Sequence, residues 1–549
     1  CAILIISCLI ISNRKHYWND ELFSFYFVSD SSFFNMLRAF HDKINNSPIL
    51  YFLFGWIWDK IFGSTEVSLR LFSSLAICMA LVLVWVTLRR IYGFWATSIG
   101  TLAVFCTSPI ILIQNSEARM YALYLAFCAL GFFFYDYFYR IRVPNNKLLW
   151  LNAAVHLAVI HTHLFGGFYS AAILVSIFLT DRYFSLFRPK LYLSIIFSWL
   201  SILLYIPSFL NQADVGKPRT WLPQPELLDI VNVMNISAST FFNRAILPLL
   251  LFFLLLYLLR RIDSRPNVLS GKAVLFSSSE ISIIIFAVVY IAVPVFVWIF
   301  SLTIKPIFLD RYMLPTAVGW AVFFTYIFHR ILPPSITGFN FSLKPKSPPE
   351  IRITLGLLLP SAALIFFLIT PLRQAKGFQE KGLFENLPDL KKYSGLPVVV
   401  QSSHTFLQNL HYSPNPDKYY FMLDWQAAID ENSGTFSPQE FKHMEALKRN
   451  YPQMFKNVVS TDNFLNKYDR FLVLDSEDYT RKCPPKSKGL RHVAKSIYCP
   501  QWVEMRLLSD TVYNVTVVNS SNLFTILLVQ RRDKTTRITS SFARLLKNG

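Results

Sequence analysis

The sequence predicts a multi-span α-helical membrane protein with a soluble α/β domain at its C-terminal end. Hydrophobic residues make up 53% of the 549 residues and charged residues only 16%, whereas a soluble domain has about 25% charged residues. Long apolar segments recur up to residue 371, and the composition then becomes polar. These features exclude disordered, coiled-coil and collagen-like chains. They divide the sequence into a transmembrane domain, 1–371, and a soluble domain, 372–549.

About 11 transmembrane helices are expected, because each crossing requires about 20 mostly apolar residues. The first apolar segment, 1–12, is too short to cross, and the chain begins at Cys1, so we expect this helix to be truncated. The other candidates are 66–88, 94–113, 119–139, 147–162, 164–181, 191–210, 245–260, 280–300, 312–329 and 353–371.

Basic residues set the expected orientation. Lys and Arg total 53 against 33 Asp and Glu, a net charge of +20. They gather in alternate loops, such as 89–90, 182–190 and 330–352, which the positive-inside rule places in the cytoplasm. The excess of basic over acidic residues therefore reflects membrane topology. No nucleic-acid partner is expected. An odd number of crossings places residues 372–549 outside the cytoplasm.

Two apolar segments of the first outer loop, 22–40 and 48–62, are interpreted as interfacial helices, because counting 48–62 as a crossing would invert every later loop. Trp56 and Trp58 suit the membrane interface. In the soluble domain, strands are expected at 397–401, 470–475, 512–518 and 523–530, and a helix at 438–449.

The first outer loop contains two adjacent carboxylates, Asp20 and Glu21, beside Trp18. Aromatic walls and partial desolvation raise a carboxyl pKa and prepare the group to act as a general base. The alternative is that both are solvated acids that balance Arg14 and Lys15.

Charged residues also stand at the outer ends of later helices. Arg119 would hold a phosphate while Glu117 orients it, or the two would form a structural ion pair. Lys305 and Arg311 add cations on the same outer side, suited to an anionic lipid headgroup. The alternative is that they snorkel to the lipid surface.

A divalent metal is the one cofactor that the sequence leaves open. His161 and His163 form a metal pair without a third ligand nearby in the sequence, which is a weak signal. Cys483 and Cys499 would close a short loop as a disulfide in an oxidising compartment. The chain has no C-x-x-C pair.

In order along residues 1–330, several motifs resemble the membrane glycosyltransferases of family 39, which have the GT-C fold and include protein O-mannosyltransferases and lipid A aminoarabinose transferases. The matching segments are Tyr17-Trp-Asn-Asp-Glu21, Ser47-Pro-Ile-Leu-Tyr51, Phe62-Gly-Ser-Thr-Glu-Val-Ser-Leu-Arg70, Ser116-Glu-Ala-Arg-Met-Tyr121, His161-Thr-His-Leu-Phe165, Trp221-Leu-Pro223 and Arg311-Tyr-Met-Leu-Pro315.

This resemblance implies transfer of a hexosyl or mannosyl group from a polyprenyl-phosphate carrier to a glycan, lipid or protein acceptor, in the bacterial inner membrane. It implies that Asp20 is the general base, with Glu21 beside it, and that Arg119, Arg311 and Lys305 bind the donor phosphate. Supporting roles fall to Glu117, Arg70, Tyr121 and Trp18. The chain departs from its relatives at Asn45-Asn46-Ser47-Pro48, where they have a Pro-Pro pair preceded by His or charged residues, so metal dependence and acceptor identity do not carry over.

Two rival functions are a transporter or flippase of lipid-linked sugars, and an inactive relative that acts as an assembly subunit. Transporters typically place ionisable residues near the membrane midplane. Here they gather at outer helix ends, which favours chemistry at the membrane surface. The retained Asp20, Glu21 and Arg119 favour an active enzyme.

Overall fold

The structure is a computed structural model, and it describes residues 1–141, 144–216, 224–233, 278–332, 348–378, 391–425, 438–476, 507, 512–520 and 524–532. The chain forms two compact units. The helical unit comprises Cys1–Lys15, Ser47–Ile206 and Leu222–Gln379. The α/β unit comprises His16–Asn46, Pro207–Trp221 and Glu380–Gly549, so it also includes two segments that precede the boundary expected at residue 372.

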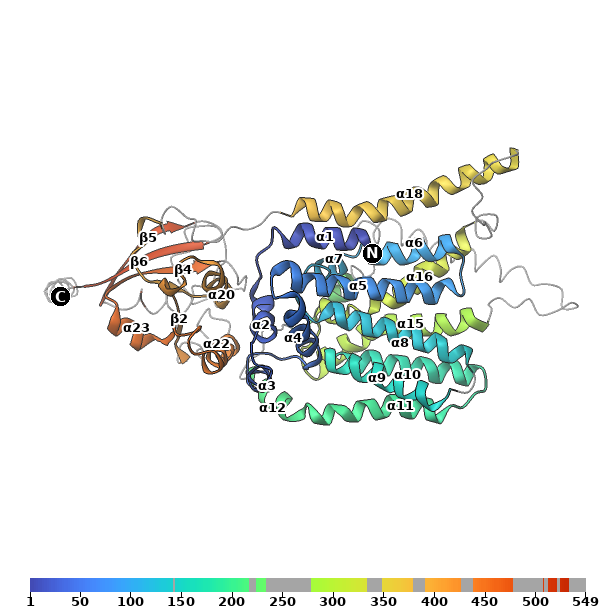
Figure 1. Cartoon of the computed structure of the whole chain (residues 1–549), viewed down its shortest axis with the longest axis horizontal. Coiled ribbons are helices and arrows are strands. Elements are labelled where there is room, and N and C mark those ends of the chain that lie inside the picture. Colours follow the sequence, from blue (N-terminus) through green and yellow to red (C-terminus); the bar gives the residue numbers. More distant parts are fainter. Residues whose placement is uncertain are drawn as a thin grey trace, which may run out of the picture. The chain divides into compact units, whose positions relative to one another are not determined.

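The helical unit follows the apolar segments of the sequence. Its described helices are α1 (Ala2–Ser12), α4 (Leu50–Phe62), α5 (Glu66–Arg89), α6 (Phe94–Phe105), α7 (Pro109–Gln114), α8 (Tyr121–Arg140), α9 (Asn146–Thr162), α10 (Gly166–Tyr183), α11 (Pro189–Leu200), α13 (Leu227–Val233), α15 (Ser278–Thr303), α16 (Thr316–Ile331) and α18 (Pro348–Gly377). The axes of helices α5, α8 and α15 lie roughly parallel to one another, with α8 in contact with both α5 and α15 (Figure 1).

The expected crossing 94–113 is two helices, α6 and α7. Ser108 caps α7 by accepting a hydrogen bond from the backbone N–H of Ile111, and Pro109 is the first helical residue, a position where its missing N–H costs nothing. The expected crossing 245–260, Trp221 and the pair Cys483 and Cys499 lie outside the described residues.

Three described helices, α5, α8 and α15, are long and apolar enough to cross a membrane. A bent pair, Pro189–Leu204 with α12 (Ile206–Ala213), adds a fourth if its 57° bend lies within one crossing. The total of about 11 crossings, each of roughly 20 apolar residues, stays a prediction.

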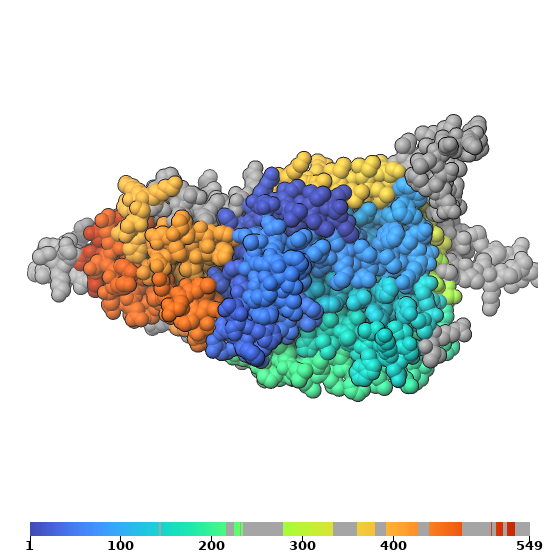
Figure 2. Space-filling model, in the orientation of Figure 1, coloured from blue at the N-terminus to red at the C-terminus, as the bar shows by residue number. Residues whose placement is uncertain are grey.

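The outer surface of the helical unit is apolar. Trp150 on α9, Phe178 on α10 and Phe197 on α11 are all exposed, and α9 and α10 form part of the face seen in Figure 2. Soluble proteins rarely expose contiguous apolar surface of this kind, so it suits contact with lipid.

Distant parts of the sequence pack closely inside this unit. On α6, a Cβ added at Gly100 would clash with the backbone nitrogen of Thr325 on α16. Small residues permit such close helix approach in membranes. At the end of α10, Asp181 pairs with Arg188 at 2.6 Å, and both side chains are largely buried. Ion pairing of this kind compensates the burial of charge.

The α/β unit contains a six-stranded mixed sheet in the order β3-β2-β1-β4-β6-β5. The pairs β3–β2, β2–β1 and β1–β4 are parallel, whereas β6 is antiparallel to both β4 and β5. The strands are β1 (Val398–Val400), β2 (Tyr419–Leu423), β3 (Val458–Ser460), β4 (Arg470–Ser476), β5 (Tyr513–Ser520) and β6 (Phe524–Arg531), and the helices between β1 and β4 include α20 (Ser403–Tyr412), α22 (Pro438–Asn450) and α23 (Thr461–Lys467). Four of these strands and α22 overlap the segments expected from sequence.

Part of the first outer loop also belongs to the α/β unit, as helices α2 (Asn19–Val28) and α3 (Phe33–His41). The backbone N–H of Tyr17 donates to the hydroxyl of Tyr412 at 2.7 Å, and the Gln408 side chain donates to the Tyr17 carbonyl at 3.0 Å. Both partners are on α20, so the start of α2 is fixed by residues almost 400 positions later.

Candidate active site

Asp20 and Glu21 lie in the first turn of α2 but in different surroundings. Trp18 is the N-cap residue, with an extended backbone. Glu21, three positions later and fully buried, accepts a hydrogen bond from the Trp18 backbone N–H at 3.3 Å. This is one half of a capping box. Asp20 is half-buried, and the helix N-terminus favours its negative charge. Of the two predicted carboxylates, Glu21 is engaged in capping and Asp20 is partly accessible.

His443 on α22 lies against the same helix. Its ring is 5.4 Å from that of Phe23, one turn after Asp20, and residues three apart share a helix face. Its Nδ1 is hydrogen-bonded to the carbonyl oxygen of Lys43. A carbonyl only accepts, so Nδ1 carries the hydrogen. Burial holds the pKa of His443 below its usual value, opposed by the Lys43 hydrogen bond and the charge of Asp20. His443 is therefore neutral at pH 7, with Nε2 as an acceptor.

A second cluster lies in the helical unit, around the turn between α7 and α8. Glu117 accepts from Lys15 at 3.2 Å and from Gln114 at 3.0 Å. Arg70 on α5 is fully buried and donates to the Lys15 carbonyl at 2.6 Å. A buried guanidinium requires such partners. Arg70 and Glu117 thus hold Lys15 by its backbone and side chain respectively.

The predicted phosphate-binding arginines converge on one aromatic ring. The guanidinium carbons of Arg119 and Arg311 lie 5.9 Å and 5.6 Å from the ring centroid of Tyr121. This is within the range of cation–π attraction. Arg119 is buried, whereas Lys305 is exposed. The structure therefore brings Arg311 to Arg119 and Tyr121, which precede it by about 190 positions in the sequence.

His163, in the loop between α9 and α10, completes the wall of this cluster. Its ring lies 5.5 Å from that of Tyr121 and 4.9 Å from that of Tyr312. Burial, together with the positive charges of Arg119 and Arg311, holds the pKa of His163 well below its usual value. A neutral imidazole therefore stands beside two permanent cations.

The two histidines of the predicted metal pair have different partners. His161 is 2.8 Å from the hydroxyl of Ser201. His163 Nδ1 accepts from the backbone N–H of Phe165 at 3.2 Å. Across the described ranges, no group of three or more His, Cys, Asp or Glu side chains is arranged to hold a metal ion. The pair therefore gains no third ligand from the described part of the chain.

Sequence reasoning missed His443. It lies in a polar helix with no recognisable motif around it, and its relation to Asp20 depends on a contact between residues more than 400 positions apart. A histidine between Lys442 and Met444 in such a helix gives no signal that separates a functional residue from a packed one.

Comparison with known proteins identifies the fold. No family model matches the sequence, and no curated protein matches it. Among solved structures, ArnT from Cupriavidus metallidurans bound to undecaprenyl phosphate has a TM-score of 0.51 and 12% identity, over 96% of both chains. The apo state of the same protein has a TM-score of 0.52, with the same identity and coverage. The oligosaccharyltransferase AglB from Archaeoglobus fulgidus, in complex with an inhibitory peptide and a dolichol-phosphate, scores 0.42, with 12% identity over 86% of this chain and 69% of its own.

The chain is thus a helical membrane protein of the GT-C fold, as the sequence motifs predicted. A particular protein that it is similar to along nearly its whole length is ArnT from Cupriavidus metallidurans.

Proposed function

We propose that this chain is a membrane glycosyltransferase that moves a sugar from a polyprenyl-phosphate carrier to an acceptor hydroxyl on the extracytoplasmic face. The observation that carries the proposal is the convergence of Arg119 and Arg311 on Tyr121. The GT-C fold supports it, because a structure with this fold contains bound undecaprenyl phosphate.

Two guanidinium groups suit a phosphate that leaves with the donor lipid. Guanidinium is planar, always charged, and able to donate two parallel hydrogen bonds to phosphate oxygens. Negative charge grows on the leaving phosphate as the bond to the sugar breaks, and fixed cations stabilise that charge without reorganising. The neutral His163 and the Tyr121 ring lie beside the two cations.

Asp20 is proposed as the general base toward the acceptor. The acceptor hydroxyl loses a proton as its oxygen attacks the anomeric carbon, and a half-buried carboxylate accepts that proton. Glu21 is the weaker candidate, because its carboxylate is buried and hydrogen-bonded to the Trp18 backbone.

The test uses purified protein in liposomes with radiolabelled polyprenyl-phosphate sugars and envelope acceptors. We expect Asp20→Asn to lower sugar transfer at least about 100-fold, as loss of a general base does, with undecaprenyl phosphate binding retained. Arg119→Met should weaken that binding. Asp462→Asn, which changes an exposed acid on α23, is the matched control and should leave both unchanged.

Unchanged sugar transfer in Asp20→Asn would show that Asp20 is not the general base. Unchanged undecaprenyl phosphate binding in both Arg119→Met and Arg311→Met would show that the two arginines do not form the donor site. Movement of labelled lipid across the bilayer without donor consumption would establish a flippase instead.

A further inference from the structure

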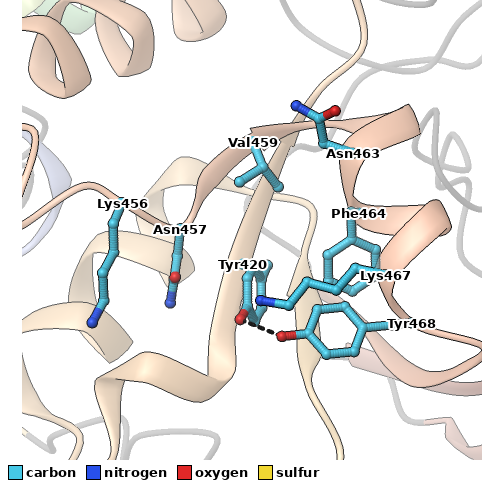
Figure 3. A pocket seen from close by; sticks show the side chains of 8 residues that line it. All are labelled: Tyr420, Lys456, Asn457, Val459, Asn463, Phe464, Lys467 and Tyr468. Atoms are coloured by element: carbon cyan, nitrogen blue, oxygen red, sulfur yellow. Dashed lines mark hydrogen bonds between the residues drawn. The ribbon is translucent and has the colours of Figure 1, made fainter.

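The α/β unit contains a pocket of about 300 Å³ that is formed by neither Asp20 nor the arginine cluster. It is lined by Tyr420 from β2, Val459 from β3, Lys456 and Asn457 just before β3, and Asn463, Phe464, Lys467 and Tyr468 from α23 and its end (Figure 3). Pockets for small molecules span about 300–1,000 Å³, so this one has room for a small ligand.

One wall of the pocket is aromatic. The ring centroids of Tyr420 and Phe464 lie 5.1 Å apart, those of Phe464 and Tyr468 4.9 Å, and those of Tyr420 and Tyr468 5.5 Å. The hydroxyls of Tyr420 and Tyr468 are hydrogen-bonded at 2.8 Å, as Figure 3 shows. Both tyrosines are only half-buried. The rings brace one another and still offer partly exposed aromatic surface.

The lining is positively charged. It includes two lysines and two asparagines but no carboxylate. The ammonium of Lys467 lies 5.1 Å from the Tyr468 ring centroid. Lys456 is exposed and pairs with Asp417 at 2.9 Å, on the side of Tyr420 away from Lys467 in Figure 3. Because exposed ion pairs contribute little energy, Lys456 can exchange Asp417 for an anionic ligand at small cost.

The phenol of Tyr468 responds to this charge. Desolvation raises its pKa, but the hydrogen bond from Tyr420 and the nearby ammonium of Lys467 outweigh that effect, so the pKa of Tyr468 is lower than usual. Part of this lowering comes from Lys467, so its ammonium lies close enough to the Tyr468 oxygen to favour a negative charge there.

We propose that this pocket binds a saccharide that carries a phosphate or carboxylate. Tyrosine rings present flat apolar faces with a polar edge, which suit the C–H face of a sugar ring. The Asn463 amide is suited to hydrogen bonds with sugar hydroxyls. Asn457 donates its Nδ2 hydrogens to the carbonyls of Asp417 and Tyr419 and so offers a ligand only its side-chain oxygen, as an acceptor. Lys467 and Lys456 pair with the anionic substituent through charge-assisted hydrogen bonds.

This inference goes beyond the proposed function, since it adds a second sugar-binding site whose lining includes neither Asp20 nor Arg119. A glycosyltransferase whose acceptor is an anionic envelope glycan would gain affinity from such a site, because a second contact on one ligand raises its effective concentration at the first.

The experiment is isothermal titration of the full chain in detergent with three probes: glucose 6-phosphate, glucose and inorganic phosphate. Glucose 6-phosphate should bind at least about tenfold more tightly than either part alone, since each lost charge-assisted contact is worth roughly one such factor. Lys467→Met should weaken its binding about tenfold on the same basis, and Tyr420→Phe, which keeps the ring, should weaken it less.

Lys418→Met is the matched control. The Lys418 ammonium lies 5.0 Å from the Tyr419 ring centroid, much as that of Lys467 lies over Tyr468, but Lys418 does not line the pocket. It should leave binding unchanged. Binding should also persist in Asp20→Asn and in Arg119→Met, so that loss of the proposed catalytic function and loss of this pocket are separate results.

Four outcomes would overturn the proposal. They are no binding of glucose 6-phosphate, equal affinity for glucose, equal affinity for inorganic phosphate, and unchanged binding in Lys467→Met. Equal affinity for phosphate would mean a simple anion site, and equal affinity for glucose would mean a neutral sugar site. Loss of binding in Arg119→Met with Lys467→Met unaffected would place the ligand at the arginine cluster.

Discussion

At the scale of single residues, neighbours in the sequence have different surroundings. Successive residues of an α-helix point about 100° apart, so Asp20 and Glu21 cannot face the same way. Glu21 turns back to the Trp18 backbone and is fully buried, whereas Asp20 is half-buried near His443. The sequence could indicate the acidic pair, but only the start of α2 separates the capping acid from the candidate base.

Glu21 substitutions should therefore affect stability more than chemistry. Glu21→Gln keeps an oxygen that can accept from the Trp18 N–H and should retain most activity. Glu21→Ala should lower the free energy of unfolding by about 1 kcal/mol, a typical loss for a capping residue. The measurements are sugar transfer and thermal unfolding in detergent. A 100-fold loss of transfer in Glu21→Gln, of the size expected for a general base, would instead make Glu21 catalytic.

His443 should make the α/β unit sensitive to acid. Its pKa is lowered on folding, so the unfolded chain binds the proton more readily. The stability from a neutral His443 is then complete above the unfolded pKa of about 6.5 and is lost as the pH falls through and below that value. Its charged neighbours are Asp20 on α2 and, next to it on α22, Lys442.

The measurement compares thermal unfolding of wild type and His443→Gln at pH 7.5 and pH 5. The glutamine variant should be less stable than wild type at pH 7.5, and the difference should shrink at pH 5. His404→Gln changes a half-buried histidine on α20 and is the control. An equal difference at both pH values would contradict the prediction.

At the scale of elements, surface ion pairs accompany the packing of α3 against α22. Asp42 at the end of α3 accepts from Arg449 at 2.8 Å and from Asn450 at 2.8 Å. Desolvation raises the pKa of Asp42, but these hydrogen bonds and the charge of Arg449 lower it overall. Arg449 is 53% exposed, so solvent screens the pair.

The Asp42–Arg449 coupling should accordingly be small. A double-mutant cycle with Asp42→Asn and Arg449→Met should give less than about 1 kcal/mol, and the value should fall as salt rises. Lys456 and Asp417, an exposed pair at 2.9 Å in the same unit, supply the control cycle. A salt-independent coupling of several kcal/mol would mean that the pair is desolvated in solution.

Hydropathy predicted the helices well because a crossing is a local property: twenty apolar residues suffice wherever they pack. The expected crossings 66–88 and 119–139 match α5 and α8 closely. The strands β2 and β3 were missed because they are short and gain their stability from neighbours on the sheet rather than from their own composition. Likewise, the motifs predicted Asp20 and Arg119 as candidates, but the approach of Arg311 to Tyr121 depends on packing between distant segments of the chain.

At the scale of the whole molecule, the α/β unit is assembled from three separate segments of the chain, 16–46, 207–221 and 380–549. Segments that share one soluble unit must lie on the same side of a membrane. An even number of crossings must therefore separate them. The expected crossings number six between residues 46 and 207 and four between 221 and 380, and both are even. Counting 48–62 as a crossing would make the first number odd, so the parity supports an interfacial α4 (Leu50–Phe62).

The shared unit and the positive-inside rule together predict which residues a membrane-impermeant thiol reagent reaches in spheroplasts. In a chain whose seven cysteines are replaced by serine, Ser31→Cys and Asp462→Cys should both be labelled, because both are exposed residues of the α/β unit. Lys190→Cys, also exposed but in a basic loop, should be labelled only after permeabilisation, because basic loops face the cytoplasm. Labelling of all three after permeabilisation shows that each thiol is reactive. Labelling of Ser31→Cys and Asp462→Cys on opposite sides of the membrane would show that these residues do not belong to one unit. Labelling of Lys190→Cys in intact spheroplasts would contradict the expected topology.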